Sequence, residues 1–244
     1  MTNLVAVSRC RYMVQLELDL LVLFTLALGP GIFWVWYFYQ RDRYEPEPAY
    51  LILRMFLLGI AVTFPVAFIE GLIAVLVASP LFLAAIVAPI VEEYGKYFVV
   101  RRFVYRDREF NEPMDGIVYA TAAALGFASL ENVIYIFSAY ALSPAAALGT
   151  VIIRALFSVP AHALFASIWG YALGRAKFSP PEQRQGIVVR GLVLAMVLHG
   201  VFNFLLISAE VFAVAMLIFV LVLVPGMWIL VNRNIGRALR QGRR

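Results

Sequence analysis

The sequence predicts an all-α, polytopic integral membrane protein with about seven transmembrane helices. Hydrophobic residues make up 63% of the chain and its mean hydropathy is +0.87, whereas soluble domains contain about 45 to 50% apolar residues. Apolar runs of about 20 residues, the length that crosses a bilayer, recur along the chain and leave almost no residues for a soluble domain. We therefore expect one embedded domain at residues 16–231, an N-terminal extension at 1–15 and a basic tail at 232–244.

Each predicted span is an apolar run that ends at charged or turn-forming residues. In chain order the spans cover Leu16–Tyr39, Tyr50–Val77, Leu81–Val100, Asp115–Tyr140, Ala145–Leu173, Ile187–Ser208 and Val211–Val231. The first ends in the aromatic cluster FWVWYFY, which is typical of a membrane interface, and a polar loop, RDRYEPEP, follows it. This first run is too long for a cleaved signal peptide and has no small-residue cleavage site after it.

Positive charges lie in alternate loops and in the tail. The basic residues are Arg41 and Arg43 after the first span, Arg101, Arg102, Arg106 and Arg108 after the third, Arg175, Lys177, Arg184 and Arg190 around the loop after the fifth, and those of the tail NRNIGRALRQGRR. The positive-inside rule then places the N-terminus outside and the C-terminus in the cytoplasm. We attribute the pI of about 9.5 to this orientation in the lipid bilayer, and expect no nucleic-acid partner. The single cysteine, Cys10, supports neither an internal disulfide nor a thiolate metal site.

A set of polar residues falls inside these spans, where each ionisable side chain costs a few kcal/mol to insert. They are Glu92, Glu93 and Lys96 on the third span, Glu131 and Asn132 on the fourth, Arg154 and His162 on the fifth, and His199 and Asn203 on the sixth. Both histidines of the chain are among them. At about 1.5 Å per residue from the predicted cytoplasmic ends, Glu92, His199, His162 and Glu131 lie roughly 14, 14, 20 and 24 Å into a core about 30 Å thick. We expect these four side chains to meet near the middle of the membrane.

Helical spacing indicates which of these groups share a face. Glu92 and Lys96 are four residues apart, as are His199 and Asn203, so each pair lies on one face, while Glu93 is turned by about 100°. Small residues recur every four positions at Ala120, Ala124 and Ala128 and, after His162, at Ala166, Gly170 and Gly174. Such stripes let helix backbones approach closely.

Each feature also has a purely structural interpretation. A membrane histidine can serve only as an interhelical hydrogen bond, and Glu92 with Lys96 can form an ion pair that neutralises itself. We expect Arg154 to pair with one of the glutamates and Glu70 to reach toward the outer interface. These interpretations do not explain why two histidines, three glutamates and an amide gather on four consecutive spans.

Histidine and glutamate are the ligands of catalytic zinc sites, which use three protein groups and leave a position for water. A further carboxylate can act as general base, and an amide can stabilise an oxyanion. The set therefore fits hydrolysis of an amide bond within the membrane. No HExxH is present, so the residues alone leave a secondary transporter equally open, and also a catalytically silent immunity or scaffolding protein that binds a membrane partner.

Several segments resemble the PrsW family of intramembrane proteases over about residues 34–204. They are EPEP at 45–48, VEEYGK at 91–96, MDGIVYATAAALGFASLENVIY at 114–135, RALFSVPAHALFASIWGYALG at 154–174 and LHGVFNF at 198–204. The family motifs EExxK, FxxxE and a histidine followed four residues later by Asp or Asn fall on Glu92, Glu93 and Lys96, on Phe127 and Glu131, and on His199 and Asn203. The family often has aspartate where this chain has Asn203, which favours hydrogen bonding there over acid-base chemistry. Glu131 stands where the wider group, with CAAX prenyl endopeptidases and bacteriocin-immunity proteins, has histidine.

The resemblance implies a metalloprotease of the prokaryotic cytoplasmic membrane that cuts a single-span membrane protein, such as an anti-sigma factor, on the outer side. Two assignments of the residues remain open. In the metal version, Glu131, His162 and His199 hold zinc, Glu92 is the general base, Glu93 pairs with Lys96 or orients a ligand, and Asn203 stabilises the oxyanion. In the metal-free version, Glu92 and Glu131 activate water, and His199 with Asn203 forms the oxyanion hole. The metal version is favoured because grouped carboxylates in a low dielectric repel one another without a cation among them.

Overall fold

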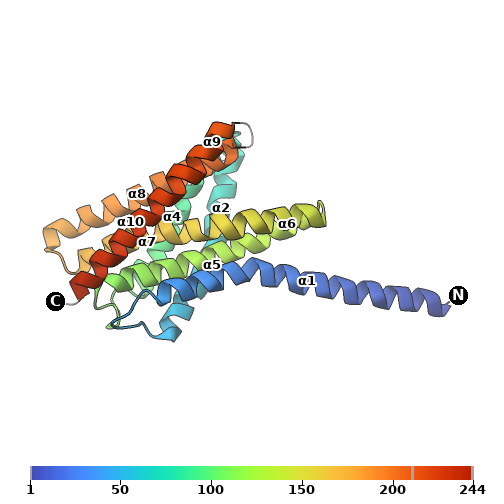
Figure 1. The fold of residues 1–244 in the computed structure, drawn as a ribbon, viewed down its shortest axis with the longest axis horizontal. Coiled ribbons are helices and arrows are strands. Elements are labelled where there is room, and N and C mark those ends of the chain that lie inside the picture. The colour runs from blue at the N-terminus through green and yellow to red at the C-terminus, as the bar shows by residue number, and fades with distance from the viewer. Residues whose placement is uncertain (1, 210–211, 243–244) are drawn as a thin grey trace.

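The protein is described here from a computed structural model, which covers the backbone of residues 2–209 and 212–242 and the side chains of these residues from Asp19 onward. Every regular element in this part of the chain is a helix, which confirms the predicted all-α class (Figure 1). The α-helices are α1 (Thr2–Tyr39), α2 (Ala49–Leu76), α3 (Pro80–Phe82), α4 (Ala88–Phe103), α5 (Pro113–Tyr140), α6 (Pro144–Ile153), α7 (Val159–Lys177), α8 (Pro181–Ser208), α9 (Ala213–Ile218) and α10 (Val224–Gly242). Three π-helical segments join some of them: η1 (Leu83–Val87), η2 (Arg154–Ser158) and η3 (Phe219–Leu223).

Six helices are long and apolar enough to cross a membrane, counted within the described residues. They are Asp19–Tyr39, Ala49–Leu76, Pro113–Tyr140, Pro144–Lys177, Pro181–Ser208 and Ala213–Gly242. The predicted third span, Leu81–Val100, also forms a continuous helix through α3, η1 and α4. It is not among those six because it carries three charged residues, Glu92, Glu93 and Lys96. The count of seven spans and the orientation remain predictions.

The predicted end segments are continuous with the first and last helices. The backbone of the N-terminal extension belongs to α1 from Thr2 onward, and α10 continues through the predicted tail to Gly242. Met1, the side chains of residues 2–18, and residues 243 and 244 lie outside the described residues.

Helix starts follow from local sequence. Proline occupies the first position of four helices, where its missing N–H costs nothing because that group has no partner inside the helix; these residues are Pro80, Pro113, Pro144 and Pro181. At the start of α5, Glu112 and Asp115 form a capping box, with each side chain accepting from the other residue's backbone N–H. The start of α5 is therefore firmly tied to the loop before it.

Each π-helical segment ends two residues before a proline, at Pro89, Pro160 and Pro225. Proline has no N–H, so it leaves the carbonyl four residues earlier without its α-helical partner. In these π-helical segments, called wide turns below, the backbone hydrogen bonds instead reach back five residues. Examples are the bonds from the N–H of Ala88 to the oxygen of Leu83 and from the N–H of Val159 to the oxygen of Arg154. The helices thus pass the prolines without a break, and each takes up one extra residue.

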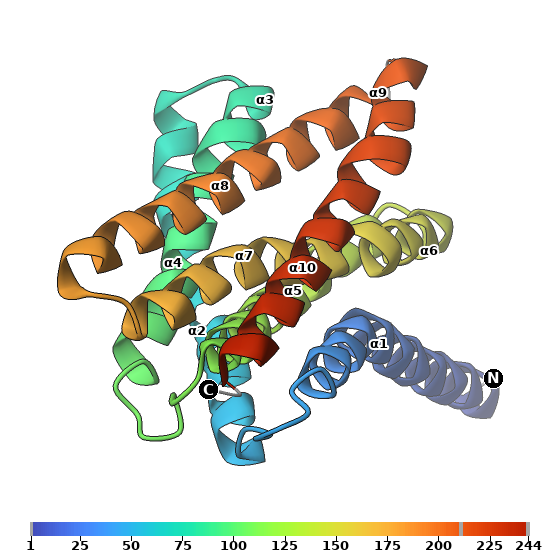
Figure 2. The same cartoon turned by 60° about the vertical axis from the view of Figure 1, so that its left-hand side comes forward.

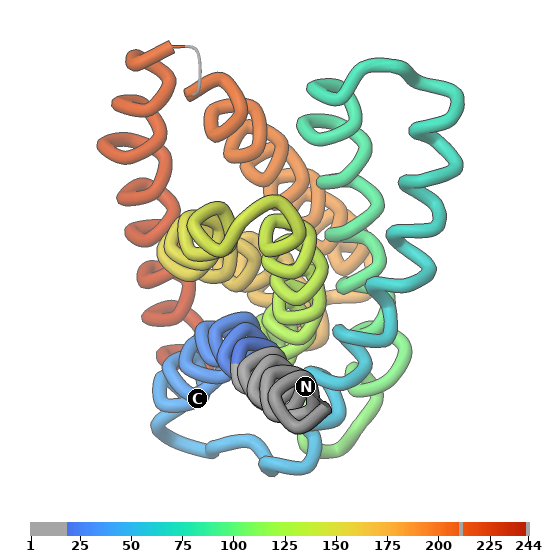
Figure 3. The backbone as a smooth tube through the Cα atoms, turned by 90° about the vertical axis from the view of Figure 1, so that its right-hand side faces the viewer, coloured from blue at the N-terminus to red at the C-terminus, as the bar shows by residue number. Residues whose placement is uncertain are grey.

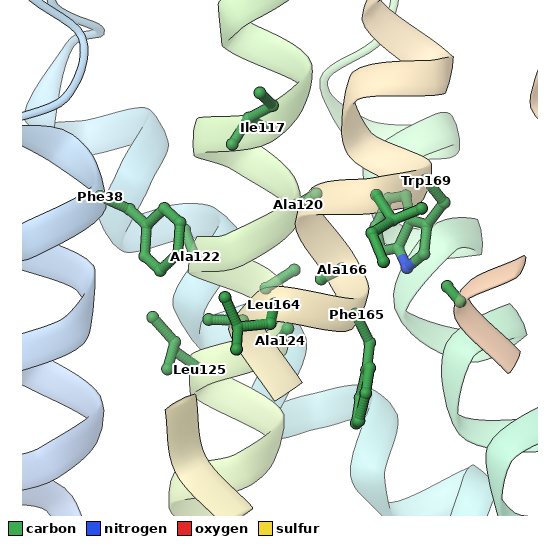
Figure 4. Close-up of a cluster of buried hydrophobic side chains, with 14 of the residues drawn as sticks. Phe38, Ile117, Ala120, Ala122, Ala124, Leu125, Leu164, Phe165, Ala166 and Trp169 are labelled. Carbon is green, nitrogen blue, oxygen red and sulfur yellow. The ribbon is translucent and has the colours of Figure 1, made fainter. Parts of the chain in front are cut away.

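The core is centred on α5 and α7, which pack against each other more extensively than any other pair. In Figure 4, Phe38 of α1 meets Ala122 and Leu125 of α5, while Phe165 and Trp169 of α7 lie on the far side of α7 from α1. In Figure 3, α2 with α3 and α4 lies to one side of this pair and α10 lies to the other. Helix α8 packs against both α7 and α4. The two central helices are therefore shielded from lipid and can carry polar groups.

The small-residue stripes bring backbones together as predicted. A Cβ added at Gly170 of α7 would collide with the carbonyl oxygen of Gly116 of α5, and one added at Gly59 of α2 would collide with the backbone of Ala123. These close approaches leave no room for side chains between the helices. They fix the distances across which the polar residues of α4, α5 and α7 meet.

Replacement of Gly59 with alanine is expected to destabilise the bundle, because the new methyl group must push α2 away from α5. Overpacking of this kind costs about 1 to 3 kcal/mol, which corresponds to a fall in Tm of on the order of 5 °C for a chain of this size. The matched control is Gly71→Ala on the same helix, where an added Cβ meets nothing within 4 Å. Thermal unfolding of both variants in detergent checks this, and equal Tm values would contradict the close packing.

Candidate active site

The charged residues of α4 point into the bundle. Glu92, Glu93 and Lys96 are 5%, 0% and 0% exposed, respectively. They lie one to two helical turns after Pro89 and the wide turn of η1, on the side of α4 that faces α7 and α8. The predicted inward orientation of these three groups is confirmed.

The ammonium of Lys96 is the centre of a hydrogen-bonded network. Its Nζ donates to Glu92 Oε2 at 3.1 Å and to Glu93 Oε1 at 2.8 Å, and lies 3.0 Å from Nδ1 of His162 on α7. The ring of Phe127 on α5 covers it at 4.4 Å. A fully buried ammonium keeps its charge only when it is paired in this way, so Lys96 neutralises part of the charge on the two glutamates.

Glu93 holds His199 in place. Its Oε1 lies 3.0 Å from His199 Nδ1, and its Oε2 accepts a hydrogen bond from the indole nitrogen of Trp169 at 2.9 Å. The ring of Phe165 stacks on His199 with centroids 4.6 Å apart. Glu93 therefore contacts both Lys96 and a histidine, which is the geometry that either of its two predicted roles requires.

Glu131 holds the other histidine. Its Oε2 lies 2.9 Å from His162 Nε2 and 3.3 Å from Nη2 of Arg154. Arg154 also donates from Nε to Asn132 Oδ1 at 2.5 Å, and Asn132 donates to the carbonyl oxygen of Ala27 on α1 at 3.0 Å. The predicted role of Arg154 as partner of a glutamate is confirmed.

The two histidines are arranged as metal ligands usually are. A ligating histidine commonly gives its second ring nitrogen to a carboxylate. Here His199 uses Nδ1 for Glu93 and His162 uses Nε2 for Glu131. Nε2 of His199 remains, and Nδ1 of His162 lies 3.0 Å from Nζ of Lys96, a contact that it would exchange for one to a metal ion. The donor atoms therefore fit a zinc ion, for which imidazole and carboxylate are suitable ligands.

The carboxylate that completes this group is Glu92. One donor atom each from Glu92, His162 and His199 lie within 4.8 Å of one another, and all three residues are buried. The ligands predicted from the sequence were His162, His199 and, as the third ligand, Glu131 in place of Glu92. In the structure, Glu131 contacts the Nε2 atom of His162, whereas Glu92 lies close to both histidines.

A cavity of about 640 Å³ adjoins these groups. Its polar wall is formed by Glu70, Glu92, Glu131, Arg154, Ser158, His162, His199 and Asn203. It extends past Ala74 and Pro80 to Leu206, that is, to the end of the bundle where α2 and α8 finish and α3 begins (Figure 2). This is the end opposite the basic loops, so the charged groups are reached from that side.

Asn203 lines the same cavity from α8, one helical turn after His199. Its Nδ2 donates to the carbonyl oxygen of Ala84 in the wide turn η1 at 2.8 Å. An amide nitrogen has two hydrogens, so a second donor remains for another oxygen. Five of the seven predicted site residues therefore line one cavity, namely Glu92, Glu131, His162, His199 and Asn203. The other two, Glu93 and Lys96, contact His199 and Glu92.

Sequence reasoning missed two residues of the site. Glu70 was expected to reach the interface, but its Oε1 is buried without a hydrogen-bond partner and the residue lines the cavity. This correction follows from the path of α2 beside the cavity, which a single sequence does not define. Trp169 was not singled out, since one indole in an apolar helix gives no signal of the carboxylate it binds.

Comparisons with known proteins identify the family. The profile of the PrsW family intramembrane metalloprotease matches residues 47–230. Protease PrsW of Geobacillus kaustophilus is 41% identical over 203 residues, which cover 82% of this chain and 87% of the relative. Protease PrsW of Bacillus subtilis is 33% identical over 186 residues, covering 75% and 82% of the two chains.

A third relative, Protease PrsW of Clostridioides difficile, is 32% identical over 209 residues, covering 83% of this chain and 85% of the relative. No solved structure shows a significant match. Because the profile and the relatives match most of a chain rich in membrane-spanning helices, this protein belongs to the PrsW family of intramembrane metalloproteases of the bacterial plasma membrane.

Proposed function

We propose that this protease uses a zinc ion to hydrolyse a peptide bond in single-span membrane proteins, with anti-sigma factors as the substrate class suggested by the family resemblance. The observation that carries the proposal is the grouping of Glu92, His162 and His199 within 4.8 Å, on the wall of a cavity. When bound there, zinc would supply Lewis-acid activation of water and of the substrate carbonyl.

The residues behind the proposed ligands hold them in position. Glu93 and Glu131 accept hydrogen bonds from Nδ1 of His199 and Nε2 of His162, which fixes the two tautomers so that Nε2 of His199 and Nδ1 of His162 carry the lone pairs. A bound metal ion would replace Lys96 as the partner of His162 Nδ1. Trp169 fixes the far oxygen of Glu93. These contacts support a rigid set of three ligands, as efficient catalysis requires.

Glu131 is the best-placed proton acceptor once Glu92 is assigned as a ligand. It lines the cavity and is paired with Arg154 at 3.3 Å. We propose that Glu131 accepts the proton of the attacking water and then delivers it to the leaving amine, while His162 keeps its own N–H bonded to the same carboxylate. The free N–H of Asn203 then stabilises the negative charge that develops on the carbonyl oxygen.

The position of the cavity supports attack near one membrane surface. It extends toward the end of the bundle opposite the basic loops, which the positive-inside rule assigns to the outer side. A substrate helix at that end can present an unwound segment to the cavity, where polar groups replace the lost backbone hydrogen bonds. We therefore propose that the cut lies near the outer surface.

Cleavage of a single-span anti-sigma-type substrate by the purified protein in detergent tests this proposal. Removal of metal with a chelator is expected to lower the rate at least about 100-fold, and zinc is expected to restore it, because both the water and the carbonyl lose their Lewis acid. Metal content, measured on the same samples, is expected to follow activity. Full activity in a sample shown to be free of metal would instead support the metal-free version, with Glu92 and Glu131 activating water.

The substrate class is tested separately from the mechanism. A panel of unrelated single-span proteins serves as the comparison. If zinc-dependent cleavage is found only with other members of the panel, the anti-sigma assignment is wrong while the mechanism stands.

A further inference from the structure

A second group of carboxylates lies at the opposite end of the bundle from the cavity. It is formed by Asp42 and Glu47, from the RDRYEPEP loop between α1 and α2, and by Asp115, in the first turn of α5. In Figure 1 this loop and the start of α5 lie at the same end as the C-terminus. Asp115 precedes Glu131 by sixteen residues on one helix, roughly 24 Å, so the two acidic groups are separate sites.

The three carboxylates have the spacing of ligands to one ion. One oxygen from each lies within 4.8 Å of the other two, and oxygen ligands about 2.3 to 2.6 Å from a calcium ion are separated by at most about twice that distance. Asp42 and Glu47 are 3% exposed and Asp115 is 0% exposed. Segments 73 residues apart in the sequence, at positions 42 and 115, thus converge on one buried point.

Several of these oxygens have no partner. Both oxygens of Asp42 and Oδ1 of Asp115 are buried without a hydrogen bond. Other oxygens of the group are used: Tyr119 donates its hydroxyl to Glu47, and the backbone N–H groups of Asn111 and Glu112 donate to Asp115 Oδ2. The bonded oxygens fix the group in place, and the unbonded oxygens of Asp42 and Asp115 remain buried without a partner.

Within the described residues, no arginine, lysine or histidine nitrogen lies within 4 Å of these three carboxylates. The nearby Lys177 donates its ammonium to backbone oxygens of Tyr105 and Phe110. Ionised carboxylates at this position are therefore unfavourable unless a cation joins them.

We propose that Asp42, Glu47 and Asp115 bind a hard divalent cation, Mg²⁺ or Ca²⁺, at a structural site distinct from the catalytic centre. An all-oxygen, triply anionic set suits these ions, whereas zinc prefers nitrogen and sulfur ligands. The cation ties the loop between α1 and α2 to the first turn of α5. This gives a physical role to the EPEP segment and to Asp115 of the MDG segment, which the proteolytic site does not use.

The test is cation binding to the full-length protein in detergent after removal of bound metal. The His162→Ala/His199→Ala double variant is used so that the catalytic ligands do not contribute. Equilibrium dialysis against Mg²⁺ and, separately, Ca²⁺ is expected to show one ion per chain. At about 100 times the Kd, Tm is expected to rise by on the order of 5 °C.

Asp42→Asn in the same background is expected to weaken binding at least about 10-fold and to remove the Tm shift, because it deletes the one ligand whose oxygens are both unpaired. The matched control is Glu109→Gln, at an exposed position in the loop between α4 and α5. Since Asp42→Asn also removes repulsion, its Tm without cations should equal or exceed that of the parent. Absence of a bound ion in the parent, or an equal Tm shift in both, would show that protons alone neutralise the group and would overturn the proposal.

Discussion

Replacing Glu92 with glutamine is expected to abolish proteolysis, with kcat/KM lowered by at least about 10³-fold, and to remove the bound zinc as well. The change keeps the size of the side chain but replaces a carboxylate ligand with a neutral amide. Glu92 is one of the three groups whose donor atoms lie within 4.8 Å of one another at the cavity wall. Cleavage rate and zinc content of the same purified sample are the measurements.

The control is Glu109→Gln, which makes the same chemical change at an exposed loop position and should leave both quantities unchanged. The result also separates the two assignments of the metal version. A Glu92→Gln protein that is inactive but keeps one zinc per chain would favour Glu92 as general base and Glu131 as ligand. Normal cleavage by this variant would contradict both.

Replacing Lys96 with methionine is expected to cause the largest loss of stability. Lys96 is fully buried and its ammonium contacts Glu92, Glu93 and His162. Removing one partner from such a network leaves uncompensated charge and costs about 3 to 5 kcal/mol, equivalent to a fall in Tm of on the order of 10 °C. Thermal unfolding of the metal-free protein in detergent measures this loss.

Arg102→Met provides the comparison, because Arg102 is exposed on the same helix and its loss should change Tm by less than about 2 °C. Zinc binding should restore part of the stability that Lys96→Met loses, because the zinc ion can replace the ammonium in neutralising the charge of Glu92 and Glu93. An unchanged Tm in Lys96→Met would mean that the carboxylates are neutralised by protons instead.

Much of this architecture could be predicted from the sequence. Apolar runs define the helices because a bilayer demands about 20 apolar residues, and every described helix that they predicted is present. The grouping of Glu92, Glu131, His162 and His199 followed from depth along parallel or antiparallel helices. Depth and helical face are properties of single helices, which is why they could be read from the chain.

The details that the sequence could not provide depend on contacts between helices. Rotation and tilt of the helices decide which carboxylate lies beside which imidazole, and the structure groups Glu92 with both histidines while Glu131 contacts His162. Glu70 was placed wrongly for the same reason. The acidic group at Asp42, Glu47 and Asp115 was not foreseen, because a loop has no helical period from which to infer its neighbours.

The wide turn η2 also changes which residues of one helix share a face. Arg154 and His162 are eight residues apart, which in a regular helix would separate them by about 80°. With one extra residue taken up by the π-helical turn, the separation falls to about 20°. Both side chains consequently reach the same oxygen of Glu131, at 3.3 and 2.9 Å.

In evolutionary terms, the site depends on a residue count as well as on residue identities. A gene that lost one codon between Arg154 and His162 would still encode every motif of the family. Its helix would return to a regular period, and the seven remaining steps would still leave Arg154 about 20° from His162. A change that removed the wide turn without removing a residue would instead turn Arg154 by about 100° from its present position. A family member with eight residues in a regular helix would therefore need another residue to hold its glutamate.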